Sequence, residues 1–331
     1  MDINIFTAAL RTEFIKSMDA VPEGELNWKK YTQVIPSTAR IENYPWMAPP
    51  PRLSRYLGHR RYTQLDQIKY TVANVEYDAG LTVSTRDVDD DQVGGYMIRV
   101  GELGAEAAQF PGIAVVRDAL ANAGSLPCFD GSNFFATSHN VGTYPSAPAG
   151  FGGGGNALTF TSTNTSDAAT YKMIFLIHKN KLKPLLWQNR KAPKINTTAG
   201  TPQSIEAKEA HYFIDMEGAP AFGYWWDALQ ITITNTPSIN DMFTCFDAAY
   251  KTFYQFALPA ALTTDPTLYV HQGLQFTSEN CTILCSTGLF ALLRHALYED
   301  RVGVSVANST SGITSNIYYN NFGLETSPYL N

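Results

Sequence analysis

Residues 62–85 read YTQLDQIKYTVANVEYDAGLTVST, in which apolar and polar residues alternate and Tyr, Val, Thr and Ile are frequent. Alternation of this kind predicts β-strands, and Asp78-Ala79-Gly80 is a turn signal, so the segment predicts a long β-hairpin or ribbon. A two-stranded ribbon is only marginally stable alone in water. The ribbon is therefore expected to lie against another surface, such as that of a second subunit.

The segment before the ribbon predicts a projecting arm. Phe6, Leu10, Phe14 and Met18 recur every four residues. This spacing predicts an amphipathic helix over residues 4–18 with one apolar face. Three consecutive prolines, at positions 49–51, then keep the backbone extended.

After the ribbon, four aspartates between Asp87 and Asp91 precede apolar residues at helical spacing, which predict a helix over residues 90–109. Aspartates at a helix start cap free N–H groups and suit the positive end of the helix dipole. Pro111 is expected to start a second helix that Gly124 ends. Together the two helices form the longest helical region predicted for the chain.

The second half predicts mixed α/β structure. A flexible loop is expected at residues 142–170, where Gly, Ser, Thr and Asn dominate. The Ser-x-x-Asp at Ser238 predicts a helix start. The patterns predict strands at 171–191, 222–236, 267–274 and 316–323, and helices at 238–258 and 286–300.

The number and balance of charged residues narrow the class of protein to which the chain can belong. Only 16% of the residues are charged, against about a quarter in an ordinary soluble domain, so much of the surface is expected to face other protein. The net charge of −6 argues against a wide nucleic-acid interface, because neutralising phosphates requires clustered Lys and Arg. The sequence contains no signal peptide and no run of eighteen apolar residues, so we expect a soluble protein made in the cytoplasm.

Cys128, Asp130 and His139 place a nucleophile, a carboxylate and a base close together in the sequence, and a cysteine-dependent hydrolase could use such a set. Catalytic Cys and His usually come from separate parts of a fold. A turn-rich structural segment is the favoured interpretation, and no catalytic residue is expected.

No metal or cofactor is expected either. Cys281 and Cys285, flanked by His271 and His295, lack the second ligand pair of a zinc motif. The aspartates at 87–91 lack the ligand order of a calcium loop. The glycines at 152–155 lack the Gly-Lys-Ser/Thr of a phosphate loop.

Several ordered stretches resemble the major head subunits of Mu-like bacteriophages. STARIENYPWMAPPPRLSRYLGHRRY, at residues 37–62, is similar to the family's Tyr-x-Trp, Pro and Gly-x-Arg region. LPCFDGSNFFATSHNVG, at 126–142, is similar to its Cys-Tyr-Asp-Gly segment, although Asn140 stands where the family usually has Pro. Further similar stretches lie at 181–195, 222–234 and 267–274.

The resemblance implies the α+β major capsid fold of tailed phages and herpesviruses. It divides the chain into an N-terminal arm (1–55), an extended ribbon called the E-loop (56–88), a peripheral domain (89–234) with a spine helix (90–109), an axial domain (235–305) and a return strand (306–331).

The expected function is a capsid subunit that assembles into the icosahedral head around the phage DNA, and not an enzyme. The expected partners are copies of itself in hexamers and pentamers, scaffold, portal and decoration proteins, and DNA through weak contacts. A tail or decoration subunit and a cysteine-dependent hydrolase are the alternatives. The candidate interface residues are aromatic and apolar side chains of the arm and ribbon and the basic residues between them: Phe6, Leu10, Phe14, Trp28, Trp46, Arg55, Arg60, Arg61 and Tyr62.

Overall fold

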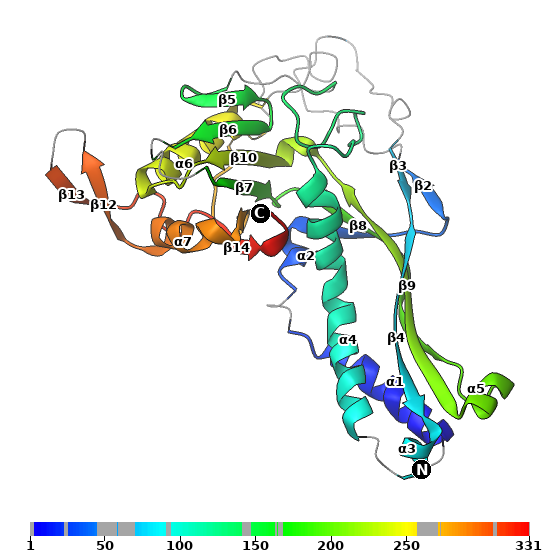
Figure 1. The fold of residues 1–331 in the computed structure, drawn as a ribbon. Helices are drawn as coiled ribbons and strands as arrows, with labels where there is room; N and C mark the ends of the chain where they lie inside the picture. The colour runs from blue at the N-terminus through cyan, green and yellow to red at the C-terminus, as the bar shows by residue number, and fades with distance from the viewer. Residues whose placement is uncertain are drawn as a thin grey trace. The chain divides into compact units, whose positions relative to one another are not determined.

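The computed structural model describes residues 3–22, 26–44, 58, 70–90, 94–140, 147–162, 164, 168–256, 271, 273–306 and 310–330. The chain forms two compact units (Figure 1). The first unit comprises Met1–Glu42, Val72–Val115 and Leu186–Ala221, and the second comprises Asn43–Thr71, Val116–Leu185 and Phe222–Asn331. None of the described helices is long and apolar enough to cross a membrane.

The first unit is built on a four-stranded sheet in the order β1-β8-β9-β4. Its strands are β1 (Thr32–Pro36), β8 (Leu185–Thr197), β9 (Glu209–Phe222) and β4 (Val75–Ser84). Strand β4 pairs antiparallel with β9 over its whole length, from Val75 opposite Gly218 to Ser84 opposite Glu209.

The predicted turn at Asp78-Ala79-Gly80 is wrong, because β4 runs straight through these residues. The alternating pattern correctly predicts a strand, but the strand that pairs with it is distant in the sequence. Gly80 allows β4 and β9 to approach closely and does not form a turn. A Cβ at this position would lie 3.1 Å from the backbone oxygen of Tyr212 on β9.

Glu217 on β9 gives this sheet a buried charge. Its side chain is 3% exposed and forms ion pairs with Arg190 and with Lys191, whose Nζ lies 2.8 Å from Oε2. The hydrogen bond from Lys191, supported by Arg190 and opposed by burial, lowers the pKa of Glu217 below its usual value of 4.5. The folded state therefore holds this carboxylate ionised more strongly than the unfolded chain does.

We expect this ion pair to make folding stability depend on pH. Because the folded pKa is lowered, the stabilisation is complete above the unfolded value and is lost as the pH falls through the folded value. Urea unfolding between pH 6 and pH 3 should show wild-type protein losing more stability than Glu217→Gln. Equal losses in the two proteins would contradict the assignment.

Helices cover the same sheet. The predicted N-terminal helix is confirmed as α1 (Ile3–Asp19), and the helix predicted at 90–109 corresponds to α4 (Gly94–Ala114). The two helices pack closely, since a Cβ at Gly104 would lie 2.6 Å from the backbone oxygen of Phe14. The short helices of the unit are α2 (Trp28–Tyr31), α3 (Thr85–Asp89) and α5 (Pro202–Ala207).

Two details of α4 differ from the prediction. Pro111 lies inside α4 and does not start a new helix. After α4 ends at Ala114, a π-helix follows over Val115–Ala119 and a 3-10 turn over Leu120–Asn122. Asp87 and Asp89 belong to α3, whose N-cap is Ser84. Asp87 still contacts α4, because it accepts a hydrogen bond from the Tyr96 hydroxyl at 2.6 Å.

The second unit contains a six-stranded sheet in the order β14-β11-β7-β10-β6-β5. Its strands are β5 (Phe151–Gly154), β6 (Ala157–Thr161), β7 (Thr170–Ile177), β10 (Ala228–Thr234), β11 (Cys281–Ser286) and β14 (Gly323–Ser327). The flexible loop predicted at 142–170 is therefore partly wrong, because β5 and β6 form an antiparallel hairpin there. Gly153 and Gly155, with φ of 82° and 60°, supply the backbone conformations that this tight connection requires.

Helices α6 (Ile239–Gln255) and α7 (Phe290–Tyr298) confirm the two predicted helices of this half. Ser238 caps α6 in a reciprocal capping box with Asp241, as its sequence indicates. Phe246 and Phe253 of α6 make edge-on ring contacts with Phe175 of β7, which joins the helix to the sheet.

The predicted strand at 316–323 is wrong. Residues 317–320 form turns, and the last strand, β14, begins at Gly323 and pairs in parallel with β11. Of the predicted strand at 267–274, His271, Gly273 and Leu274 are described and lie in no strand. The remaining strands pair in twos: β12 (Arg301–Val306) with β13 (Thr310–Ser315), and β2 (Ile41–Asn43) with β3 (Thr71–Ala73).

Candidate functional site

The apolar face of α1, predicted to bind neighbouring subunits, packs inside its own chain. Phe6, Leu10 and Phe14 are 0%, 0% and 1% exposed. They share a core with Val100 of α4 and Tyr212 of β9, and the Phe6 and Tyr212 rings meet edge-on at 5.9 Å. In this structure the three residues stabilise the subunit and leave no free surface for a neighbour.

Trp28 is likewise an internal residue. It is 8% exposed and lies directly on α4 at Gly112, where a Cβ would come within 2.5 Å of the indole ring. The other candidate interface residues, Trp46, Arg55, Arg60, Arg61 and Tyr62, lie outside the described residues.

The second unit has an apolar surface that the sequence did not indicate. Ile317 and Tyr319 are 77% and 51% exposed, whereas Tyr318 between them is buried and donates a hydrogen bond to Asp247. The backbone N–H of Asn320 bonds to the carbonyl oxygen of Leu297, so this turn lies beside the end of α7. Tyr298, at that end of α7, is 42% exposed. We call Tyr298, Ile317 and Tyr319 the turn patch.

The structure brings Cys128, Asp130 and His139 together, as their nearness in the sequence suggested. The Cys128 thiol donates to Asp130 Oδ1 at 3.1 Å, and His139 Nδ1 lies 2.9 Å from Asp130 Oδ2. The side chains of Asp130 and His139 are both 0% exposed, and the imidazole stacks on the Trp225 ring with 4.2 Å between centroids. The group belongs entirely to the second unit.

This arrangement is unsuited to nucleophilic catalysis. A catalytic cysteine requires an accessible thiolate and therefore a lowered pKa. Burial, and after it the negative charge of Asp130, raise the pKa of the Cys128 thiol, and Cys128 is only 3% exposed. The geometry thus argues against the hydrolase.

The second cysteine group, Cys281 and Cys285 with His271 and His295, does not come together as a metal site. Cys281 and Cys285 are buried in β11, His271 binds the backbone oxygen of Trp226 at 2.8 Å, and His295 pairs with Glu299. Across the ranges that the structure describes, Cys128, Asp130 and His139 are the one group of three or more Cys, His, Asp or Glu residues arranged to hold a metal ion.

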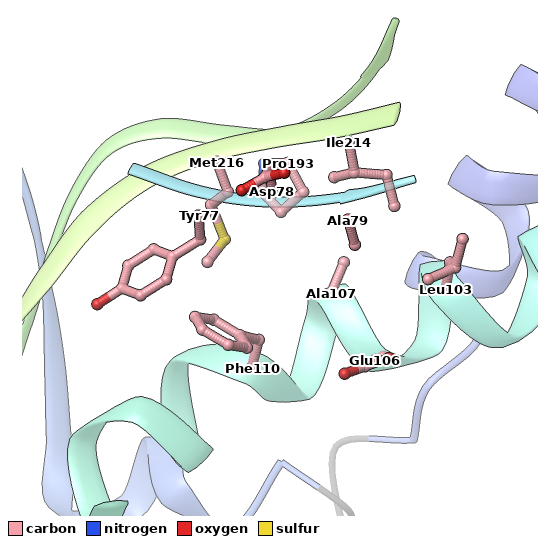
Figure 2. A pocket seen from close by; sticks show the side chains of 10 residues that line it. All are labelled: Tyr77, Asp78, Ala79, Leu103, Glu106, Ala107, Phe110, Pro193, Ile214 and Met216. Atoms are coloured by element: carbon pink, nitrogen blue, oxygen red, sulfur yellow. The ribbon is translucent and has the colours of Figure 1, made fainter. Parts of the chain in front are cut away.

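A pocket of about 100 Å³ lies between α4 and the sheet of the first unit (Figure 2). Tyr77 and Phe110 face each other there, with 4.7 Å between ring centroids. Its lining is mostly apolar and includes two carboxylates, Asp78 and Glu106, but no Cys, His, Ser or Lys. The pocket is a seam between helix and sheet, and both of its carboxylate residues are exposed.

Comparison with known proteins identifies the family of this chain. The family described as Mu-like prophage major head subunit gpT matches residues 3–242, most of the chain. The chain belongs to this family. It is a major capsid protein of the Mu-like type, a structural subunit of the virion and not an enzyme.

Curated relatives agree with this family, and solved structures share the fold. The major capsid protein of Escherichia phage Mu is 26% identical over 238 residues, which cover 69% of this chain and 73% of the relative. The Mu-like prophage FluMu major head subunit of Haemophilus influenzae is 26% identical over 213 residues, covering 62% and 66%. The procapsid of bacteriophage JBD30 matches with a TM-score of 0.72 and 20% identity over 99% of this chain and 98% of that one. The JBD30 capsid matches with a TM-score of 0.65 and 16% identity, over 92% and 90%.

Proposed function

We propose that this head subunit self-assembles into the closed icosahedral shell of a Mu-like phage, with hexamers and pentamers as its building units. The observation that carries the proposal is the agreement of the fold, over 99% of the chain, with the subunit of a procapsid. A closed shell requires each subunit to use the same few surfaces repeatedly, so that many modest contacts add up through symmetry.

The turn patch is the surface that we assign to contact with a second copy. Tyr298, Ile317 and Tyr319 come from a helix end and an adjoining turn, and all three are more than 40% exposed in the free subunit. Tyrosine is among the residue types that provide most of the binding energy at the centre of an interface, and the turn patch contains two tyrosines. The backbone of the turn is fixed by hydrogen bonds, so association costs little ordering of the chain.

Domain roles follow the family as a proposal. Strands β8 and β9 share a unit with the spine helix α4, which supports their place in the peripheral domain. Strands β7 and β10 lie in one sheet with β11 and share their unit with α6 and α7. Their place in the sheet favours grouping them with the axial segment 235–305.

The remaining partners are proposed from charge and from the needs of assembly. With a net charge of −6, the inner wall should repel DNA weakly, so that packaged DNA touches it only through non-specific contacts. Scaffold, portal and decoration proteins would bind the growing or finished shell, and assembly would take place in the host cytoplasm.

Sedimentation velocity of the chain co-expressed with the other head proteins of its phage tests the proposal. We expect most of the chain in rapidly sedimenting particles of uniform size. Recovery of the chain only as discrete monomers would contradict shell assembly. A hydrolytic activity of those monomers that Cys128→Ala abolishes would favour the enzyme instead.

A further inference from the structure

Residues 123–140 form a long irregular segment in the second unit. They contain no helix or strand, only an isolated β-bridge between Pro127 and Asn133. Even so, Phe129, Phe134 and Phe135 are at most 4% exposed. Long segments without secondary structure are uncommon inside compact domains. A buried segment of this kind needs something besides backbone pairing to fix its course.

Asn156, in the turn between β5 and β6, fixes the orientation of His139. Its Nδ2 donates to the backbone oxygens of Phe134 at 2.7 Å and Trp225 at 3.1 Å. Its Oδ1 accepts from the backbone N–H of Ala136 at 3.0 Å. The atom that faces His139 Nε2 at 3.3 Å is therefore an acceptor, so Nε2 carries a hydrogen.

The other ring nitrogen then faces two more electron-pair donors. Nδ1 of His139 lies 2.9 Å from Asp130 Oδ2 and 4.0 Å from Cys128 Sγ. Sγ itself lies 3.1 Å from Asp130 Oδ1. Some cation, either protons or a metal ion, has to lie among these three groups. Protons on Sγ and Nδ1 would join Cys128 and His139 each to Asp130, whereas one metal ion would bond to all three residues directly.

We propose that Cys128, Asp130 and His139 bind one divalent metal ion of the zinc class. Thiolate, imidazole and carboxylate are the ligands that zinc prefers. Bonds of about 2.0–2.3 Å from one ion place neighbouring ligand atoms about 3–4 Å apart, and here the separations are 2.9, 3.1 and 4.0 Å. The second carboxylate oxygen of Asp130 supplies a fourth donor.

The surroundings suit such an ion. Asn156 holds the Nε2–H of His139, and the backbone N–H of Ser132 donates to Asp130 Oδ1 at 2.9 Å, which are the outer contacts that orient metal ligands. A divalent ion with one thiolate and one carboxylate is neutral overall, so its burial avoids the cost of an isolated charge. Binding releases the proton of the thiol and the proton of Nδ1 to solvent. The ion would fix the course of the segment by linking residues 128–130 to His139.

Elemental analysis of the purified full-length protein, dialysed with zinc and then without it, tests the site. We expect about one zinc ion per chain in the wild type. Asp130→Asn and Cys128→Ala should each lose most of it. Folded wild-type protein that retains less than a tenth of this amount would overturn the proposal and leave His139 joined to Asp130 by a hydrogen bond alone.

Cobalt substitution gives a readout that depends on the cysteine itself. The cobalt protein should show a near-ultraviolet thiolate-to-metal absorption band that Cys128→Ala abolishes. Cys285→Ala is the matched control, because Cys285 is also a buried free thiol but lies in β11, and it should keep the band. A wild-type cobalt protein without the band, or a band lost in Cys285→Ala, would contradict the site.

Discussion

The free energy of unfolding of the Phe14→Ala subunit should be about 3–5 kcal/mol lower than that of the wild type. The Phe14 ring is 1% exposed and belongs to the core that joins α1, α4 and the sheet of the first unit. Its backbone oxygen also lies against Gly104, so the two helices cannot approach further to fill the cavity. Urea unfolding of the unassembled subunit measures the change.

Ile15→Ala is the control for this prediction, because Ile15 follows Phe14 on the same helix but is 53% exposed. A substitution there should change the free energy of unfolding by no more than about 0.5 kcal/mol. If Phe14→Ala kept full stability and instead prevented assembly, Phe14 would be an anchor between subunits, as the sequence pattern suggested.

The Ile317→Asp subunit should fold normally and fail to form shells. Ile317 is 77% exposed in the subunit, so a carboxylate there remains in water and leaves the fold intact. At the centre of a contact between copies, the same carboxylate would lose its water without gaining a partner, which is strongly unfavourable. Sedimentation velocity separates subunits from shells, and circular dichroism checks the fold.

Ile317→Leu keeps an apolar side chain of the same size and should assemble like the wild type. Shells formed by Ile317→Asp in normal yield would remove the turn patch from the set of assembly surfaces. Unfolded Ile317→Asp would show that the turn is part of the core of the second unit.

Local sequence signals predicted the helices well. The apolar spacing of Phe6, Leu10 and Phe14 correctly predicts α1, and the Ser238 capping box correctly predicts α6. Each of these helices is specified by residues that lie within a few turns along the helix itself, so apolar periodicity and capping are sufficient to predict it. The family resemblance supplied the fold class and the function, which periodicity alone does not determine.

Elements that depend on distant partners were predicted less well. The signal at Asp78-Ala79-Gly80 indicates a turn locally, but pairing with β9 along the whole of β4 outweighs it. Residues 75–84 are therefore one strand of the four-stranded sheet of the first unit. Pro111 also stays within α4, and the regular helix gives way to a π-helix four residues later, at Val115.

For the candidate sites, too, the sequence predicted local features better than features that depend on distant residues. An apolar stripe such as that of α1 indicates a buried face, but the sequence does not say which molecule covers it; here the same chain does. The turn patch was missed because the alternation around Ile317 resembles a strand. Cys128, Asp130 and His139 are close in the sequence, and their convergence was therefore predictable, although the contribution of Asn156 was not.

Electron microscopy of particles purified after co-expression with the other head proteins tests shell assembly most directly. The account predicts closed icosahedral shells whose repeating density is filled by the two units of this chain, with the turn patch covered by a neighbouring copy. Tubes, or discrete particles no larger than a few subunits, would contradict it.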